Sequence, residues 1–150
     1  MGNFTIENGV LIRYTGESCE VTVPDGVTAI GDEAFRGLKK LRSVTLPDGL
    51  TEIGYGAFWE CKQLTAVFIP SGVVTIAQAA FFGCSRLVEL VLPDSATNIG
   101  DSAFWCCLRL SRLMLPSGVT KIGSQTFRQC KKLKSVTIPN GVTAIGDWGS

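Results

Sequence analysis

Cysteines are the residues of this chain with the most obvious capacity for chemistry. The 150 residues include six cysteines and no histidine, which excludes a histidine-based catalytic triad, a histidine general base and a histidine metal site. The cysteines form no CxxC pair, so a zinc site is not predicted. Motifs of the P-loop, GxGxxG and GxSxG kinds are also absent. The sequence therefore predicts a protein that is not an enzyme, with no catalytic residues, no metal site and no cofactor.

Four of the cysteines recur at a constant spacing along the chain, namely Cys61, Cys84, Cys107 and Cys130. Leu38 stands at the equivalent position one spacing earlier, which indicates that these thiols are buried, reduced and packed as small apolar side chains. Spacing alone leaves open a disulfide between neighbouring members of the row. Cys19 and Cys106 fall outside the row and are the candidates for exposed, reactive thiols.

The same spacing extends over the whole chain and defines its architecture. All six prolines share one phase, and rows of phenylalanine, leucine and isoleucine keep the same step. The rows are Pro24, Pro47, Pro70, Pro93, Pro116 and Pro139; Phe35, Phe58, Phe81, Phe104 and Phe127; Leu41, Leu64, Leu87, Leu110 and Leu133; and Ile30, Ile53, Ile76, Ile99, Ile122 and Ile145. A fixed period of this size predicts a solenoid, in which each unit buries its apolar side chains only against its neighbours.

Each unit can be translated into local structure, as in the stretch LTAVFIP. Strand alternation points Val67 and Ile69 inward. Ala66 and Phe68 then point outward, and Pro70 ends the strand because proline cannot donate to the next ladder bond. An Asp-Gly or Ser-Gly turn follows, and then a second short extended piece that ends at Ile and Gly. The next Ala-Phe pair is expected to open a tight helical or 3₁₀ turn. Stacked units would place like strands about 4.8 Å apart in a parallel sheet.

The repeated run LPxGVTxIGxxAFxxCxxLxxV resembles the 23-residue leucine-rich repeats of BspA-like proteins. The resemblance covers about residues 19–147 and recurs in every unit. It implies a leucine-rich repeat solenoid with a parallel β-sheet on the concave face and short extended or 3₁₀ segments on the convex side. It also implies a cell-surface or secreted protein that attaches to other proteins, and it implies no catalytic residues.

The two ends of the chain depart from the repeat. Residues 1–18 are expected to form an N-terminal β-hairpin cap around the Asn8-Gly9 turn, and residues 19–147 the leucine-rich repeat array. Residues 148–150 are interpreted as a C-terminal tail, which marks either a truncated array or the end of an expressed segment. The N-terminal run MGNFTIENG carries no signal-peptide pattern.

Composition and charge exclude several kinds of partner. Apolar residues make up 45% of the chain and charged residues 18%, and the formal net charge is +1. This balance excludes a disordered tail and gives no overall field that would attract nucleic acid, so the basic residues of the outer units are interpreted as solvated flanks. No apolar run approaches the roughly 18 residues of a membrane span, and membrane insertion is therefore not predicted.

The positions at which the units disagree are the candidates for function. The stretches after Phe35 and Phe127 are basic and polar, whereas the three middle units carry apolar residues in two columns. The first column is Trp59, Phe82 and Trp105, where the outer units have Arg36 and Arg128. The second column is Phe68, Val91 and Met114, where the outer units have Thr45 and Thr137. The predicted partner-binding residues are these two columns and their rim: Trp59, Ala66, Phe68, Phe82, Glu89, Val91, Trp105, Arg109, Arg112 and Met114.

An exposed apolar stripe with a charged rim is typical of a binding surface. The sequence thus predicts a non-enzymatic protein-binding module, of an adhesin type or engineered from a repeated parent, whose partner is another protein. Two alternatives stay open. The columns could belong in part to the core, position 59 in particular. The apolar stripe or an open C-terminal end could instead hold the chain in a homo-oligomer.

Overall fold

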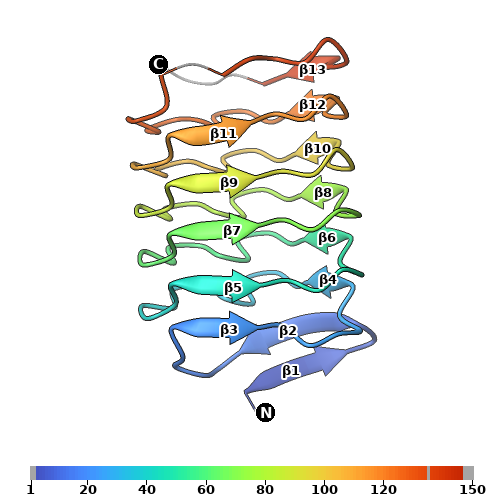
Figure 1. Cartoon of the computed structure of the whole chain (residues 1–150), viewed down its shortest axis with the longest axis vertical. Coiled ribbons are helices and arrows are strands. Elements are labelled where there is room, and N and C mark those ends of the chain that lie inside the picture. Colours follow the sequence, from blue (N-terminus) through green and yellow to red (C-terminus); the bar gives the residue numbers. More distant parts are fainter. Residues whose placement is uncertain (1–2, 135, 147–150) are drawn as a thin grey trace.

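The computed structural model describes residues 3–134 and 136–146, and these form a stack of rungs in which each rung is one 23-residue turn of a solenoid (Figure 1). The predicted C-terminal tail, 148–150, lies outside the described residues. The strands are β1 (Phe4–Glu7), β2 (Val10–Tyr14), β3 (Glu20–Thr22), β4 (Ala29–Ile30), β5 (Ser43–Thr45), β6 (Glu52–Ile53), β7 (Ala66–Phe68), β8 (Thr75–Ile76), β9 (Glu89–Val91), β10 (Asn98–Ile99), β11 (Arg112–Met114), β12 (Lys121–Ile122) and β13 (Ala144–Ile145). None of the described residues is helical.

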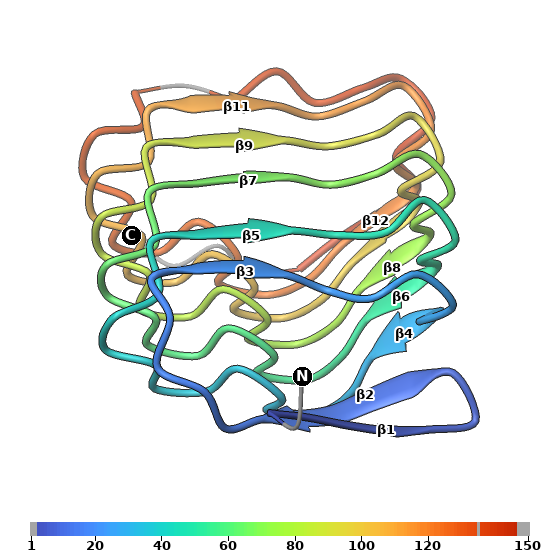
Figure 2. The ribbon, with the colours of Figure 1, turned by 60° about the horizontal axis from the view of Figure 1, so that its bottom comes forward.

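The strands form two sheets on different walls of the stack (Figure 2). The three-residue strands make a parallel sheet of order β11-β9-β7-β5-β3, which we term the front sheet. The second sheet has the order β1-β2-β4-β6-β8-β10-β12-β13 and is parallel except for its first pair. Partners are one repeat apart, so that Val67 lies beside Leu90 and Ile53 beside Ile76. The predicted parallel stacking of like strands is confirmed, and the short extended pieces prove to build a sheet of their own.

The alternation of the front strands follows the prediction. Val67 is buried between the exposed Ala66 and Phe68, and the same exposed–buried–exposed order recurs in β9 and β11. The buried side chains face the interior of the rung, where Ile69 and Leu64 are also buried. Every outward position of β7, β9 and β11 is therefore free of any packing role in the core.

The segment after each Ala-Phe pair consists of tight turns that do not continue into a 3₁₀ helix. The amide of Ala57 donates to the carbonyl of Gly54 at 3.2 Å, and that of Trp59 to Gly56 at 3.0 Å. Gly56 and Glu60 both have positive φ, 56° and 54°, which interrupts any helix. The amides of Gly56, Phe58 and Glu60 donate instead to the next rung, at 2.7–3.0 Å. The turns thus form a third hydrogen-bonded wall.

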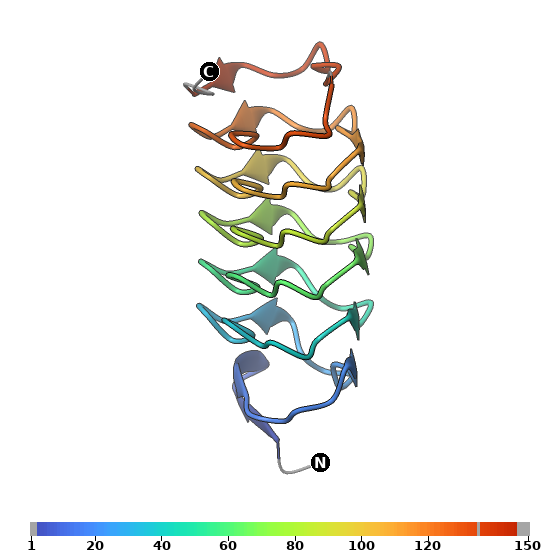
Figure 3. The same ribbon diagram turned by 90° about the vertical axis from the view of Figure 1, so that its left-hand side faces the viewer.

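A column of aromatic rings runs through the core parallel to the stack. Phe35, Phe58, Phe81, Phe104 and Phe127 lie ring on ring, with successive centroids 5.0, 5.1, 6.0 and 5.9 Å apart. The hairpin of β1 and β2 extends this column, because Tyr14 lies 5.7 Å from Phe35 and Phe4 lies 5.1 Å from Tyr14. Figure 3 shows the hairpin closing the N-terminal end of the stack. It supplies rings to the core and a strand, β2, that pairs with β4.

The cysteine row forms a second column inside the core. Cys61, Cys84 and Cys107 are fully buried free thiols, and Cys130 is 8% exposed. Each sulfur donates to a phenylalanine carbonyl one rung earlier, as Cys84 does to Phe58 at 3.1 Å. Burial raises the pKa of the Cys61 and Cys130 thiols to about 12 and that of Cys84 and Cys107 well above its usual range. These cysteines act as apolar packing residues that also bind a carbonyl.

Phenylalanine-to-alanine substitutions at two positions test the division between core and surface. Phe81→Ala removes a fully buried ring and should lower the free energy of unfolding by about 3–5 kcal/mol. Phe68→Ala makes the same chemical change at a side chain that is 69% exposed, and it should cost less than about 1 kcal/mol. Urea unfolding followed by circular dichroism measures both, and equal losses would contradict the assignment.

The buried thiols predict a loss of stability at alkaline pH. In the unfolded chain a thiol ionises near pH 8.5, about where its ordinary pKa lies. The folded state keeps Cys84 protonated well above its usual pKa. Stability is therefore complete below about pH 8.5 and falls as the pH rises, because only the unfolded state then releases these protons.

Cys84→Ser keeps a donor for the Phe58 carbonyl but removes the titration. It should flatten the dependence of the unfolding free energy on pH between 8.5 and 10.5 by up to about 1.4 kcal/mol per pH unit. Denaturant unfolding at a series of pH values gives the slope. An unchanged slope would show that this thiol is not the titrating group.

Candidate functional site

The outer face of the front sheet carries a row of large apolar side chains in its middle strands. Phe68 of β7 is 69% exposed, Val91 of β9 is 43% exposed and Met114 of β11 is 83% exposed. Register pairs Phe68 with Val91 and Val91 with Met114, so the three side chains stand next to one another on adjacent strands. Thr45 holds the equivalent position on β5. The row is thus a continuous apolar stripe that water reaches.

A row of smaller and charged residues lies beside this stripe. Ala66, Glu89 and Arg112 begin β7, β9 and β11, are paired with one another by register and are all exposed. Arg109 is exposed three residues before β11. Ion pairs among the described residues are Arg36–Glu33 and Lys40–Glu17 alone, so Glu89, Arg109 and Arg112 carry charges with no ionic partner within 4 Å.

A groove of about 600 Å³ follows the strand pair β9 and β11. Val91 and Met114 line it with Leu115, and Glu89, Asp94 and Arg112 supply its charged groups. An apolar floor with both signs of charge at its edges can accept an apolar side chain of a partner and orient the polar groups around it.

The first predicted column lies elsewhere in the rung. Trp59, Phe82 and Trp105 stand in the turn segments, outside the front strands, and none of the three is among the large exposed apolar side chains. Their rings contact one another in sequence, tilted between Trp59 and Phe82 with centroids 4.7 Å apart and edge to face between Phe82 and Trp105 with centroids 5.5 Å apart. The structure therefore does not bring the two columns into one strand face.

An arginine lies at each end of this row of three rings. The Arg36 guanidinium carbon lies 5.0 Å from the Trp59 ring centroid, and that of Arg128 lies 5.1 Å from the Trp105 ring centroid. The Nε atom of Arg128 is buried without a hydrogen-bond partner among the described residues. The arginines of the outer units thus close an aromatic ladder, which we define as Arg36, Trp59, Phe82, Trp105 and Arg128.

Two exposed apolar residues near the stripe were not among the predicted site residues. Val88 and Leu108 are each 39% exposed, and they stand just before β9 and β11. Both belong to the divergent middle units, and the outer units carry lysine or arginine at these positions, as in Lys39 and Arg42. The same contrast between units could have identified them.

The remaining candidates for chemistry do not form a site. Cys19 is exposed as predicted, but Cys106 is half-buried and burial raises its pKa, against the lowering influence of Arg128 and Lys131. The prediction that Cys106 is an exposed reactive thiol is therefore wrong in respect of exposure. No group of three or more cysteine, aspartate or glutamate side chains that could hold a metal ion occurs in the part of the chain described. That same part contains no helix long and apolar enough to cross a membrane.

Comparison with known proteins relates this geometry to a family. The model of the BspA type leucine-rich repeat region matches residues 13–104 and 57–148, with six copies of the repeat. No curated protein matches the chain.

Solved structures that resemble the chain include leucine-rich repeat proteins of bacteria. A leucine-rich repeat protein of T. pallidum is 32% identical, with a TM-score of 0.84 over 91% of this chain and 73% of its own. A leucine-rich cell surface protein of Faecalibacterium prausnitzii is 37% identical, with a TM-score of 0.84 over 91% of this chain but only 40% of its own. The pneumococcal vaccine antigen PcpA, 23% identical with a TM-score of 0.80 over 95% of this chain and 40% of its own, shares the fold.

A double-mutant cycle tests whether the aromatic ladder stabilises the solenoid. Arg36→Met and Trp59→Leu, made singly and together, should show a coupling of about 0.5–1 kcal/mol, since each single change already removes the cation–π contact. The ion pair of Arg36 with Glu33 is lost in both variants that carry Arg36→Met and cancels. Unfolding free energies that add without coupling would mean that the ladder contributes nothing through this contact.

Proposed function

The chain belongs to the BspA-type leucine-rich repeat family, and from this premise we propose that it is a non-enzymatic module that binds another protein through the front sheet of the middle units. The proposed contact residues are the apolar stripe and its neighbours: Phe68, Val91 and Met114 with Ala66, Glu89, Arg109 and Arg112. We assign Trp59, Phe82 and Trp105 of the aromatic ladder to support of the wall behind this face.

The exposure of the stripe is the observation that carries this proposal. Met114 and Phe68 leave 83% and 69% of their surface in water, although the strands beneath them are regular and their inward neighbours are buried. Because a rigid sheet already holds the backbone beneath these side chains, a partner that covers them does not have to order that backbone. Each would contribute roughly 1.5–3 kcal/mol on burial, which is enough for two or three residues to dominate a complex.

The charges around the stripe would give the contact its specificity. Glu89 and Arg112 face each other across β9 and β11 without an ion pair within 4 Å, so both remain available to a partner. Charged groups at the rim of an apolar patch fix orientation and reject partners with the wrong charge pattern. The groove along these strands offers a position for one apolar anchor of the partner.

A cell-surface setting is part of the same proposal. The F. prausnitzii relative is a leucine-rich cell surface protein, and the chain spans less than half of that protein's length. We infer that the solenoid is exposed outside the cell and contacts proteins there, as an adhesin would.

Binding measurements with paired variants test the face. Phe68→Ser and Met114→Ser should each weaken capture of the partner by about tenfold or more, since each removes an anchor worth roughly 1.5–3 kcal/mol. Thr22→Ser and Thr45→Ser change the same column on β3 and β5 and should leave capture unchanged. The measurement is a quantitative pull-down of surface proteins followed by titration of the retained protein with each variant.

Two outcomes would contradict this proposal. Capture that is equally strong with both serine variants of the stripe would exclude the face as the contact. A mass that rises with concentration in light scattering, and that Met114→Ser returns to the monomer value, would assign the stripe to self-association of the chain.

A further inference from the structure

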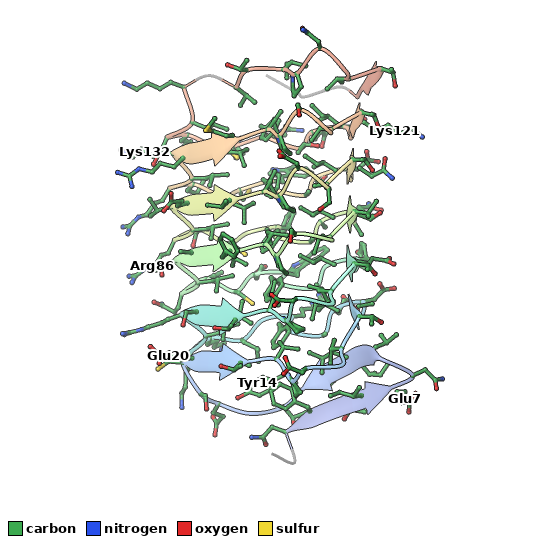
Figure 4. All side chains as sticks on the ribbon, turned by 45° about the vertical axis from the view of Figure 1, so that its right-hand side comes forward. Glu7, Tyr14, Glu20, Arg86, Lys121 and Lys132 are labelled. Carbon is green, nitrogen blue, oxygen red and sulfur yellow. The ribbon has the colours of Figure 1, made fainter. Side chains whose placement is uncertain are left out.

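Basic side chains recur at one phase of the repeat. In each unit, two residues directly follow the core cysteine, or Leu38 where leucine replaces it. In all five units at least one of these two residues is basic and neither is acidic. All of these cations are exposed, and we define them as the basic edge: Lys39, Lys40, Lys62, Arg86, Arg109, Lys131 and Lys132. Figure 4 shows Arg86 and Lys132 projecting from the same side of the stack, with Lys121 on the opposite side.

Three aspartates lie at the other end of the front strands. Asp25, Asp48 and Asp94 follow the prolines that come after β3, β5 and β9, and Glu52 lies in the second sheet. The mostly extended chain from Lys40 to Asp48 spans roughly 20–25 Å at about 3.3 Å per residue. That distance is more than two Debye lengths of about 8 Å at physiological salt. These aspartates therefore do not neutralise the basic edge, and the net charge of +1 conceals it.

The acidic residues beside the basic edge are Glu17, Glu20, Glu60 and Glu89, against its seven cations. Lys40 lies 3.5 Å from Glu17, and both side chains are largely exposed. The other cations of the edge have no ion pair in the described part of the chain. Stacked rungs set neighbouring units about 4.8 Å apart, so the edge presents cations in a line over roughly 20 Å.

We propose that the basic edge binds a linear sulfated polysaccharide that lies along the solenoid axis. A line of regularly spaced cations matches a flexible chain that carries an anionic group on successive sugars, and it needs no further recognition element. Single-stranded nucleic acid fits less well, because its binding sites add free aromatic faces for the bases. The neighbouring rings of Trp59, Phe82 and Trp105 already contact one another, and Arg36 and Arg128 lie over the two tryptophans. An anionic membrane would demand a flat basic face, and the front sheet beside the edge carries Glu89 and the apolar stripe instead.

Heparin serves as the probe, with two variants of equal charge change. Lys62→Gln/Arg86→Gln removes two cations of the basic edge, and Arg13→Gln/Lys121→Gln removes two exposed cations elsewhere. Affinity for heparin, measured by surface plasmon resonance from 50 to 200 mM NaCl, should fall steeply with salt for the unmodified chain. The edge variant should bind on the order of tenfold more weakly and lower the slope of log K against log salt by about 2, whereas the control variant should change neither.

Three outcomes would overturn the proposal. Absence of heparin binding at the lowest salt concentration, or equal losses in the two variants, would show that the edge is not a site. Tighter binding of single-stranded oligothymidine, or of mixed phosphatidylcholine–phosphatidylserine vesicles, with the same sensitivity to Lys62→Gln/Arg86→Gln would assign the edge to nucleic acid or to membrane. Phe68→Ser should leave heparin binding unchanged, which separates this result from failure of the protein-binding face.

Discussion

Each rung of this solenoid can bury its apolar side chains only against the rung before and the rung after, and this constraint governs every other feature. A core ring must meet an equivalent ring one repeat later, which produces the column of Phe35, Phe58 and Phe81 with centroids 5.0 and 5.1 Å apart. The same requirement closes the N-terminal end, where Tyr14 continues the column. Positions that point away from the core do not have to match their equivalents in neighbouring rungs. The outer residues of the front sheet can therefore change from threonine to Phe68 or Met114 while the side chains beneath them stay buried.

Much of the fold could be predicted because packing between neighbouring rungs requires the same residue types at the same positions of every repeat. The rows of proline, phenylalanine and leucine give the period, and alternation places Val67 inward and Phe68 outward, as the structure has them. The second sheet was predicted only as extended pieces, because strands of two residues such as β6 are too short to show alternation. The positive φ angles that prevent a 3₁₀ helix in the turn segments were not predicted, for a different reason. Gly56 marks the left-handed position in one unit, but Ala79 and Ser102 occupy it in the next two, so residue type does not reveal it.

The candidate site was predictable as a contrast between units but not as a geometry. Both apolar columns recur once in each middle repeat, and periodicity alone cannot distinguish an exposed side chain from one stacked on its equivalent. The arginines at the ends of the first column indicate that its side chains pack on one another. Arg36 and Arg128 lie over the terminal rings Trp59 and Trp105, so the change from arginine to aromatic residue along that column continues one stack. The change from threonine to Phe68 has no such structural partner, since the side chain is 69% exposed.

Charge follows the same logic as apolarity in a repeat protein. Summed over the chain, basic and acidic residues nearly cancel, and the sum gave no reason to expect an anionic ligand. A solenoid turns each phase of the repeat into a line along its axis, so like charges at one phase add up on one line even where the total is near zero. Lys62 and Arg86 reinforce each other on one line, while Asp48 and Asp94 lie on another that is too distant to screen them at physiological salt. Arg109 belongs both to the basic edge and to the rim of the apolar stripe, and a polysaccharide and a protein bound at the two proposed surfaces would be neighbours at this residue.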